Sequence, residues 1–338
     1  MIFRRRSADT KALKSEAYAA FERGALVAAR EAFDALLERV PDDANYRYMQ
    51  GLVCKYLRDW PSSLAHNRRS IELREERNDA SLWNAAIAAT ALGEWSEARR
   101  LWAACEIAVP DGDGPIAGDF GIASVRLNPW GRAETLYARR IDPVRARLLN
   151  IPLPESGYRR GDIVLHDGAC TGQRPLRGGW VPVFNVLARC EVSEFRTFAA
   201  FVDCPSRADL EDLLAMRVPG IDDLEDWTGD VAYYCLRCSY GAPHRHRAPE
   251  EIGDWDSERN VGIAAQSRHS AEKLLDAWAA NAPGRRVDAL ETCTAEPSAP
   301  TDDTGQWWDT PEDENADRDK TDDAHSTNDA DRDARSER

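Results

Sequence analysis

Residues 83–110 read WNAAIAATALGEWSEARRLWAACEIAVP, and this stretch decides the fold of the first third of the chain. Ala85 and Ala86 form a small pair within a helical pattern, and Gly93 provides the turn that follows it. After the turn, residues of a packing face recur at helical spacing until a proline stops them: Trp95, Ala98, Trp102, Cys105 and Pro110. The pattern predicts two antiparallel helices that approach each other closely at their small residues.

The same pattern occurs twice more upstream, so units 10–43, 44–77 and 79–112 repeat with a period of 34 to 35 residues. The first unit holds the matching residues Ala17, Gly24, Leu26, Ala29, Phe33, Leu36 and Pro41. The second unit is a weaker match, with Gly51, Arg58, Trp60, Ser63, Asn67 and Ser70. There, Arg58 replaces the turn glycine and no proline closes the unit. Three consecutive units with this spacing resemble the tetratricopeptide repeat (TPR) family, and the alternative is an unrelated array of helical hairpins.

The TPR resemblance implies a solenoid of three helical hairpins over 10–112, with a concave face built by the first helix of each pair. It places seven residues on or near that face as candidates for binding a protein or peptide partner: Lys14, Tyr18, Tyr48, Lys55, Tyr56, Trp83 and Asn84. The alternative is that Tyr48 and Trp83 pack on neighbouring repeats or on the next domain. No capping helix follows the third unit, so we expect the next domain to dock on its apolar end.

Residues 127–290 change to short apolar runs separated by Pro, Gly and Asp, after a linker over 113–126. These runs predict strands over 134–140, 146–153, 162–168, 181–187 and 196–204. A capping-box pattern at Ser206 predicts a helix over 207–217, and a partial apolar face predicts another over 262–281. Strands with few helices favour one α+β domain. Segment 128–250 is also similar to TPR-bearing proteins found beside bacterial polymorphic toxins, which implies an immunity or accessory protein that acts by binding.

The stretch CLRCSYGAPHRH, residues 235–246, holds four candidate metal ligands within twelve residues. Cys235 and Cys238 have the C-x2-C spacing of a zinc knuckle, and His244 and His246 bring the number of nitrogen and sulfur ligands to four. The H-x-H spacing is short, so Cys204 or His166 could complete the site instead of one histidine. Four such ligands leave no open position, so we expect the zinc to be structural. The alternatives are inert thiols or a redox pair.

Overall composition argues against several functions. The chain carries 59 acidic and 44 basic residues for a net charge of -15, which disfavours nonspecific nucleic-acid binding. No apolar run approaches the ~20 residues that a membrane span needs, and the N-terminal extension over 1–9 lacks the apolar stretch of a secretory signal. The eight cysteines are mostly scattered, so we expect a cytoplasmic protein with small buried thiols.

The C-terminal segment 291–338 is predicted to be disordered, because from Thr294 it carries 15 acidic residues, 5 basic residues and almost no apolar ones. Gln306-Trp307-Trp308-Asp309 is the exception. Two adjacent tryptophans in an acidic context predict either a docking motif or a segment that folds back on the body, unless the tail is simply solvated.

Together these patterns predict a multidomain chain: an all-α TPR-like solenoid, an α+β domain with a zinc knuckle, and a disordered acidic tail. The predicted function is non-enzymatic protein–protein interaction, as a bacterial immunity protein for a cognate toxin or as an adaptor. The alternative is a metal-dependent hydrolase in the second domain, for which Glu250 and Glu251 are the nearby carboxylates. A third possibility is a regulatory or chaperone adaptor that binds a peptide tail in the TPR groove.

Overall fold

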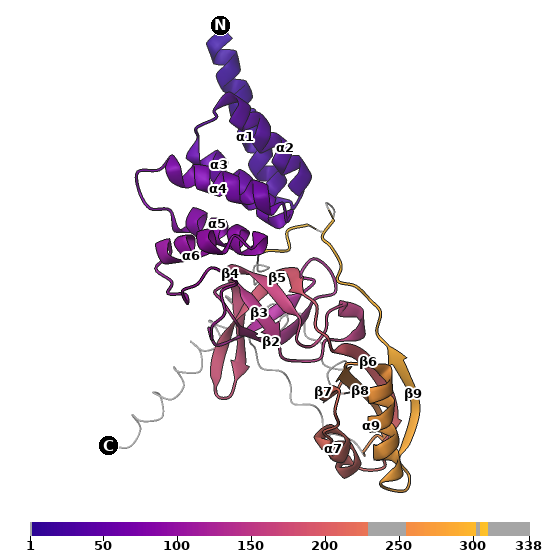
Figure 1. Cartoon of the computed structure of the whole chain (residues 1–338). Coiled ribbons are helices and arrows are strands. Elements are labelled where there is room, and N and C mark those ends of the chain that lie inside the picture. Colours follow the sequence, from indigo (N-terminus) through magenta and orange to yellow (C-terminus); the bar gives the residue numbers. More distant parts are fainter. Residues whose placement is uncertain (1, 229–254, 302–304, 310–338) are drawn as a thin grey trace, which may run out of the picture. The chain divides into compact units, whose positions relative to one another are not determined.

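The computed structural model of the chain describes residues 2–228, 255–301 and 305–309. Its first part consists of six helices that pack in consecutive antiparallel pairs (Figure 1). Their bounds are α1 (Ile2–Glu22), α2 (Leu26–Arg39), α3 (Ala44–Tyr56), α4 (Trp60–Glu72), α5 (Asp79–Leu92) and α6 (Trp95–Ala104).

The turn inside each helix pair uses a left-handed residue. Gly24 has φ +79° and Gly93 has φ +70°, a conformation that glycine adopts without steric cost. Arg58 takes the same place in the second pair with φ 60°, so its turn keeps the geometry at a conformational cost. Short polar side chains cap the starts of α3, α4 and α5, as where the Asp43 carboxylate accepts hydrogen bonds from the backbone amides of Asn45 and Tyr46.

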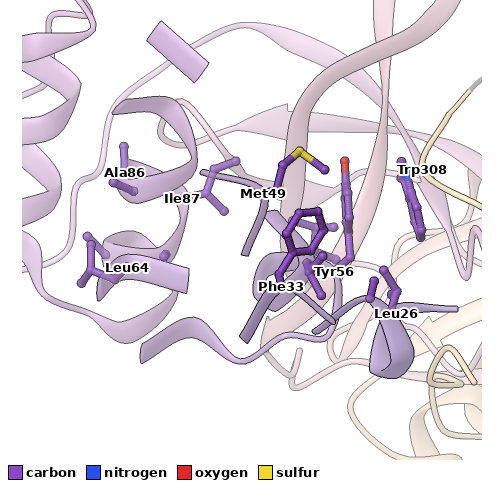
Figure 2. Packing of buried hydrophobic residues seen from close by; sticks show 14 of the residues in the cluster. Leu26, Phe33, Met49, Tyr56, Leu64, Ala86, Ile87 and Trp308 are labelled. Atoms are coloured by element: carbon purple, nitrogen blue, oxygen red, sulfur yellow. The ribbon is translucent and has the colours of Figure 1, made fainter. Parts of the chain in front are cut away.

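Small and large apolar residues alternate in the core of the helical part. Ala17, Ala29 and Ala85 are fully buried where helices approach closely, while Phe33 and Trp102 fill the larger spaces. Figure 2 shows part of this core, in which side chains from several helices converge. Each helix buries its apolar face only against its neighbours. Packing between helices therefore stabilises the array more than the helix propensity of single segments does.

The next five strands close into a small barrel: β1 (Ile122–Leu127), β2 (Glu134–Arg140), β3 (Arg145–Leu148), β4 (Ile163–Leu176) and β5 (Gly179–Glu191). Consecutive strands pair antiparallel, and β1 closes the barrel against β5 in parallel, with Ser124 opposite Val183. A parallel closing pair is required because an odd number of alternating strands brings the first and last together in the same direction. Strands β4 and β5 extend as a hairpin, turning at two left-handed residues, Arg177 and Gly178.

A second sheet follows, with strands in the order β7-β8-β6-β9, all antiparallel. Its elements are β6 (Arg196–Asp203), α7 (Arg207–Ala215), β7 (Ile221–Asp226), β8 (Glu258–Ala265), α9 (Arg268–Ala280) and β9 (Arg286–Thr292). Among the described elements this is the split βαβ arrangement. Leu213 of α7 and Trp278 of α9 lie in one buried cluster with Phe198 of β6, so both helices cover one face of the sheet.

The predicted fold class is wrong. We expected an all-α solenoid joined to one α+β domain and followed by a disordered tail, but Met1–Trp308, which includes part of that tail, forms one compact unit. The six helices are followed by two distinct sheets, one closed into a barrel and one open. Trp102 of the helices shares a buried cluster with Leu165 and Leu187 of the barrel. The sequence did not reveal this because strand partners far apart in the chain are chosen by packing rather than by local pattern.

The helix predicted over 262–281 is wrong in its first residues, because strand β8 runs to Ala265 and α9 begins at Arg268. Its start is set by Ser267, whose side chain accepts a hydrogen bond from the backbone amide of Ser270. The expected linker contains the start of β1, at Ile122. Among the described helices, none combines the length and the apolar character needed to cross a membrane.

Candidate functional site

Helix α3 and strand β4 meet at a buried ion pair. Lys55, in the last turn of α3, places its Nζ 2.9 Å from Oδ1 and 3.1 Å from Oδ2 of Asp167 on β4. The two side chains are only 4% and 3% exposed. The Asp167 Oδ1 also accepts a hydrogen bond of 2.7 Å from the backbone amide of Gly168, and the Lys55 ammonium lies 4.4 Å from the centroid of the Tyr56 ring. The pair therefore joins the helices to the barrel and satisfies two charges that would be costly to bury alone.

His166 precedes this aspartate, but the two side chains do not form a catalytic dyad. The Nδ1 of His166 lies 2.7 Å from the backbone oxygen of Asp167, and its ring stacks on Phe184 at 4.6 Å. Burial lowers the pKa of His166 to about 4, so the ring is neutral at pH 7 and Nδ1–H donates to that oxygen. Since the Asp167 carboxylate binds Lys55, the arrangement is structural and offers no general base to a substrate.

The segment Gly305–Trp308 lies against the helices and the barrel. Trp308 stacks on Tyr56 with ring centroids 4.5 Å apart and an interplanar angle of 11°, and the two rings face each other in Figure 2. Trp308 also lies 5.0 Å from the ring of Phe21. Its contacts with α1 and α3 bury Trp308 to 7% exposure. The two tryptophans thus fold back on the body, which is one of the three alternatives that the sequence left open.

Trp307 completes this contact on the barrel side. Its ring meets Tyr56 edge-on at 5.3 Å and Trp130 edge-on at 5.2 Å. The side-chain amide of Asn185 on β5 donates a hydrogen bond of 3.2 Å to the backbone oxygen of Trp307. We use the name tryptophan groove for the four residues that contact Trp307 or Trp308, namely Phe21, Tyr56, Trp130 and Asn185. It combines aromatic faces with a backbone-directed amide, which are the elements of peptide recognition.

Residues just upstream are anchored on the barrel as well. The Trp130 indole N–H donates 2.8 Å to the hydroxyl of Ser298, and Arg189 pairs with Glu296 at 2.6 Å. Gly157 lies so close to the backbone of Glu296 and Pro297 that a side chain there would overlap with them. These contacts lead the chain toward the tryptophan groove from the barrel side.

The structure brings some of the predicted partner-binding residues together and separates others. Lys55, Tyr56 and Asn84 are buried, Tyr18, Tyr48 and Trp83 are half-buried, and Lys14 is exposed. Lys55 and Tyr56 lie at the seam that also holds Trp307 and Trp308, while Lys14 lies 5.8 Å from the ring of Tyr18. The role of all seven in partner binding stays a prediction.

Trp83 packs toward the barrel, as one of the sequence alternatives expected. Its indole meets Trp102 edge-on at 5.1 Å, and a side chain on Gly168 of β4 would overlap with it. Sequence reasoning missed Phe21, Trp130 and Asn185, since nothing in the repeat pattern distinguishes them. The signal that could have found the groove was the tryptophan pair of the acidic tail.

The predicted zinc ligands Cys235, Cys238, His244 and His246 lie outside the described residues, as do Glu250 and Glu251. Within residues 2–228, 255–301 and 305–309, no group of three or more His, Cys, Asp or Glu side chains is arranged to hold a metal ion. Burial raises the pKa of Cys204, one alternative ligand, to about 11, so its thiol is protonated at neutral pH. The structural zinc site stays a prediction.

No protein-family model matches this chain, and a comparison with curated proteins finds no match. The resemblances to TPR proteins and to toxin-associated proteins stay predictions.

Proposed function

We propose that this chain is a non-enzymatic protein–protein interaction protein that binds an extended segment of its partner in the tryptophan groove. The observation that carries the proposal is the seating of Gly305–Trp308 there, with Trp308 stacked on Tyr56 and the Trp307 carbonyl bound by Asn185. Adjacent aromatic side chains in desolvated pockets are the usual anchors of protein interfaces.

The chemistry of the groove favours aromatic stacking over charge attraction. The Lys55 ammonium is already paired with Asp167, so it does not supply a free positive charge to a partner. The groove offers ring faces from Phe21, Tyr56 and Trp130 instead. A partner therefore needs an extended segment with large planar side chains.

The finer proposal is an immunity or adaptor protein of the bacterial cytoplasm whose partner is a cognate toxin. It rests on the resemblance of 128–250 to TPR-bearing proteins beside polymorphic toxins. A regulatory or chaperone adaptor that binds a peptide tail would use the same groove. The metal-dependent hydrolase is not carried further, because no observation among the described residues favours it.

The test isolates partners with the tagged full-length chain and reconstitutes each stoichiometric partner from purified components. A synthetic peptide spanning residues 294–309 is then added in excess. The expected result is that the peptide displaces the partner, while a matched peptide with alanine in place of both tryptophans does not. Partner binding that is unaffected by a saturating concentration of the wild-type peptide would place the binding site elsewhere and refute the proposal.

A further inference from the structure

The tryptophan groove already holds an occupant from the same chain, and two tryptophan side chains anchor that occupant through ring contacts. No residue of 305–309 belongs to a strand or a helix, so its removal breaks no β-ladder. Trp307 and Trp308 are 4% and 7% exposed, and they account for the ring contacts with Phe21, Tyr56 and Trp130. A segment bound in this way is separable from the fold to which it binds.

The fit of this occupant is incomplete. The indole Nε1 of Trp307 and the Oδ1 of Asn185 are both buried without a hydrogen-bond partner among the described residues. A buried donor or acceptor that lacks a partner lowers the affinity of a contact. A competing segment could donate a hydrogen bond to Asn185 Oδ1, or carry a ring without an N–H in place of the indole. Such a segment binds the same groove and leaves fewer buried polar atoms without a hydrogen bond.

The approach of the segment also depends on a particular glycine. A Cβ atom on Gly24, in the turn between α1 and α2, would overlap with the backbone of Gly305. Gly93 has a similar left-handed conformation in the turn between α5 and α6, with φ +70° against +79°. A Cβ there would meet only the Trp95 ring, at an ordinary 3.7 Å. The two turns therefore differ in contact with the segment while sharing their backbone conformation.

We propose that Gly305–Trp308 is a built-in competitor of the groove, which a partner displaces with an extended segment carrying two adjacent aromatic side chains. This inference rests on the proposed function and adds the partner chemistry and the regulation of the same site. A tethered occupant acts at an effective concentration of roughly millimolar. The apparent affinity for a partner segment is therefore the intrinsic affinity multiplied by the fraction of time that the groove is free. If the tethered segment itself binds with a dissociation constant of about 10–100 μM, the partner's apparent affinity is reduced about a hundredfold to tenfold.

The first experiment measures binding of a fluorescein-labelled peptide spanning residues 294–309 to two full-length forms, wild type and Trp307→Ala/Trp308→Ala. The expected result is that the double variant binds the peptide at least tenfold more tightly than wild type. Equal affinity would overturn the competitor role and leave the groove as a binding site. Absence of binding to a folded double variant would overturn the competitor role and count against the groove as a peptide site.

A second measurement uses the wild-type chain, so it does not depend on the stability of the double variant. Hydrogen exchange of the chain's own 305–309 amides is followed while a mass-labelled peptide 294–309 is added to saturation. Displacement predicts faster exchange in the chain's own segment; peptide binding without that change would refute the inference.

The glycine turns provide the matched variants for the same readout. Gly24→Ala is expected to speed exchange of 305–309 at least tenfold, because its Cβ overlaps with Gly305. Gly93→Ala carries a comparable backbone strain and should leave that exchange unchanged. Equal effects from the two variants would show that the contact at Gly24 does not hold the segment.

Discussion

The buried pair Lys55–Asp167 allows a quantitative test of the conclusion that helices and barrel form one unit. Lys55→Met keeps an unbranched side chain one atom shorter but leaves the Asp167 carboxylate with only its backbone donors, the nearest 2.7 Å away at Gly168. Asp167→Asn keeps an acceptor for that amide but leaves the ammonium buried without a counter-charge. Because both side chains are at most 4% exposed, each single variant is expected to lose about 3–5 kcal/mol of unfolding free energy.

The double variant Lys55→Met/Asp167→Asn removes both charges together. We expect it to be within about 2 kcal/mol of wild type, because replacing a buried ion pair by neutral groups costs far less than breaking it. The resulting coupling energy is at least about 4 kcal/mol. The assay is urea unfolding at pH 7, followed by far-UV circular dichroism for the helices and by tryptophan fluorescence.

A matched surface pair provides the control. Arg268 and Glu272 are one helical turn apart on α9, at 2.7 Å, but their side chains are 51% and 47% exposed. A cycle on that pair is expected to give a coupling of about 0.5 kcal/mol or less. If the Lys55–Asp167 coupling is no larger than this control, the reasoning from burial is wrong. Transitions of the two signals at different urea concentrations would contradict the single unit.

Three further predictions concern other parts of the chain. Arg58→Gly is expected to change the unfolding free energy by less than about 1 kcal/mol, because relief of the left-handed strain offsets the loss of a guanidinium contact 5.6 Å from the Trp130 ring. Arg58→Val should cost about 1–2 kcal/mol, because a β-branched side chain is strained at positive φ. Equal melting temperatures for the two variants would contradict this prediction. His166 has a pKa of about 4 in the folded chain and near 6.5 in the unfolded chain, so the folded state binds fewer protons between these values. As pH falls from 7 to 4, the unfolding free energy of wild type should therefore fall by up to about 3 kcal/mol more than that of His166→Phe. Parallel pH profiles of the two proteins in urea unfolding would rule this out. Cys235→Ser or chelation should release zinc and lower the melting temperature, and an unchanged melt with no zinc by elemental analysis would remove the predicted site.

Local signals predicted several elements well. The runs at 134–140 and 196–204 correspond to β2 (Glu134–Arg140) and β6 (Arg196–Asp203), and the capping box at Ser206 predicted the start of α7. The helix start at Arg268 was missed because the apolar run of β8 continues almost to its cap and resembles a helical face. Each of these predictions concerns a single helix or strand, because the sequence pattern that identifies such an element lies within a few neighbouring residues.

The candidate site was only partly accessible to this reasoning. The tryptophan pair at 307 and 308 was noticed because the sequence around these two large aromatic residues is otherwise polar and acidic. The residues that contact the pair were not predicted. Phe21 lies in α1, Trp130 in the connection between β1 and β2, and Asn185 in β5, so the three are far apart in sequence. Nor does the chain around Lys55 indicate that its counter-charge lies 112 residues away.

The sequence by itself therefore determined where helices turn and begin, through Gly24 and Gly93 in left-handed turns and Asp43 as a cap. Those outcomes depend on backbone conformation and on hydrogen bonds between near neighbours, which local residue types control. Only the tertiary structure decided that five strands close into a barrel, that Lys55 pairs with Asp167, and that Trp307 and Trp308 pack on Tyr56. Each of these joins distant parts of the chain, and its free energy comes from burial that no single segment can provide alone.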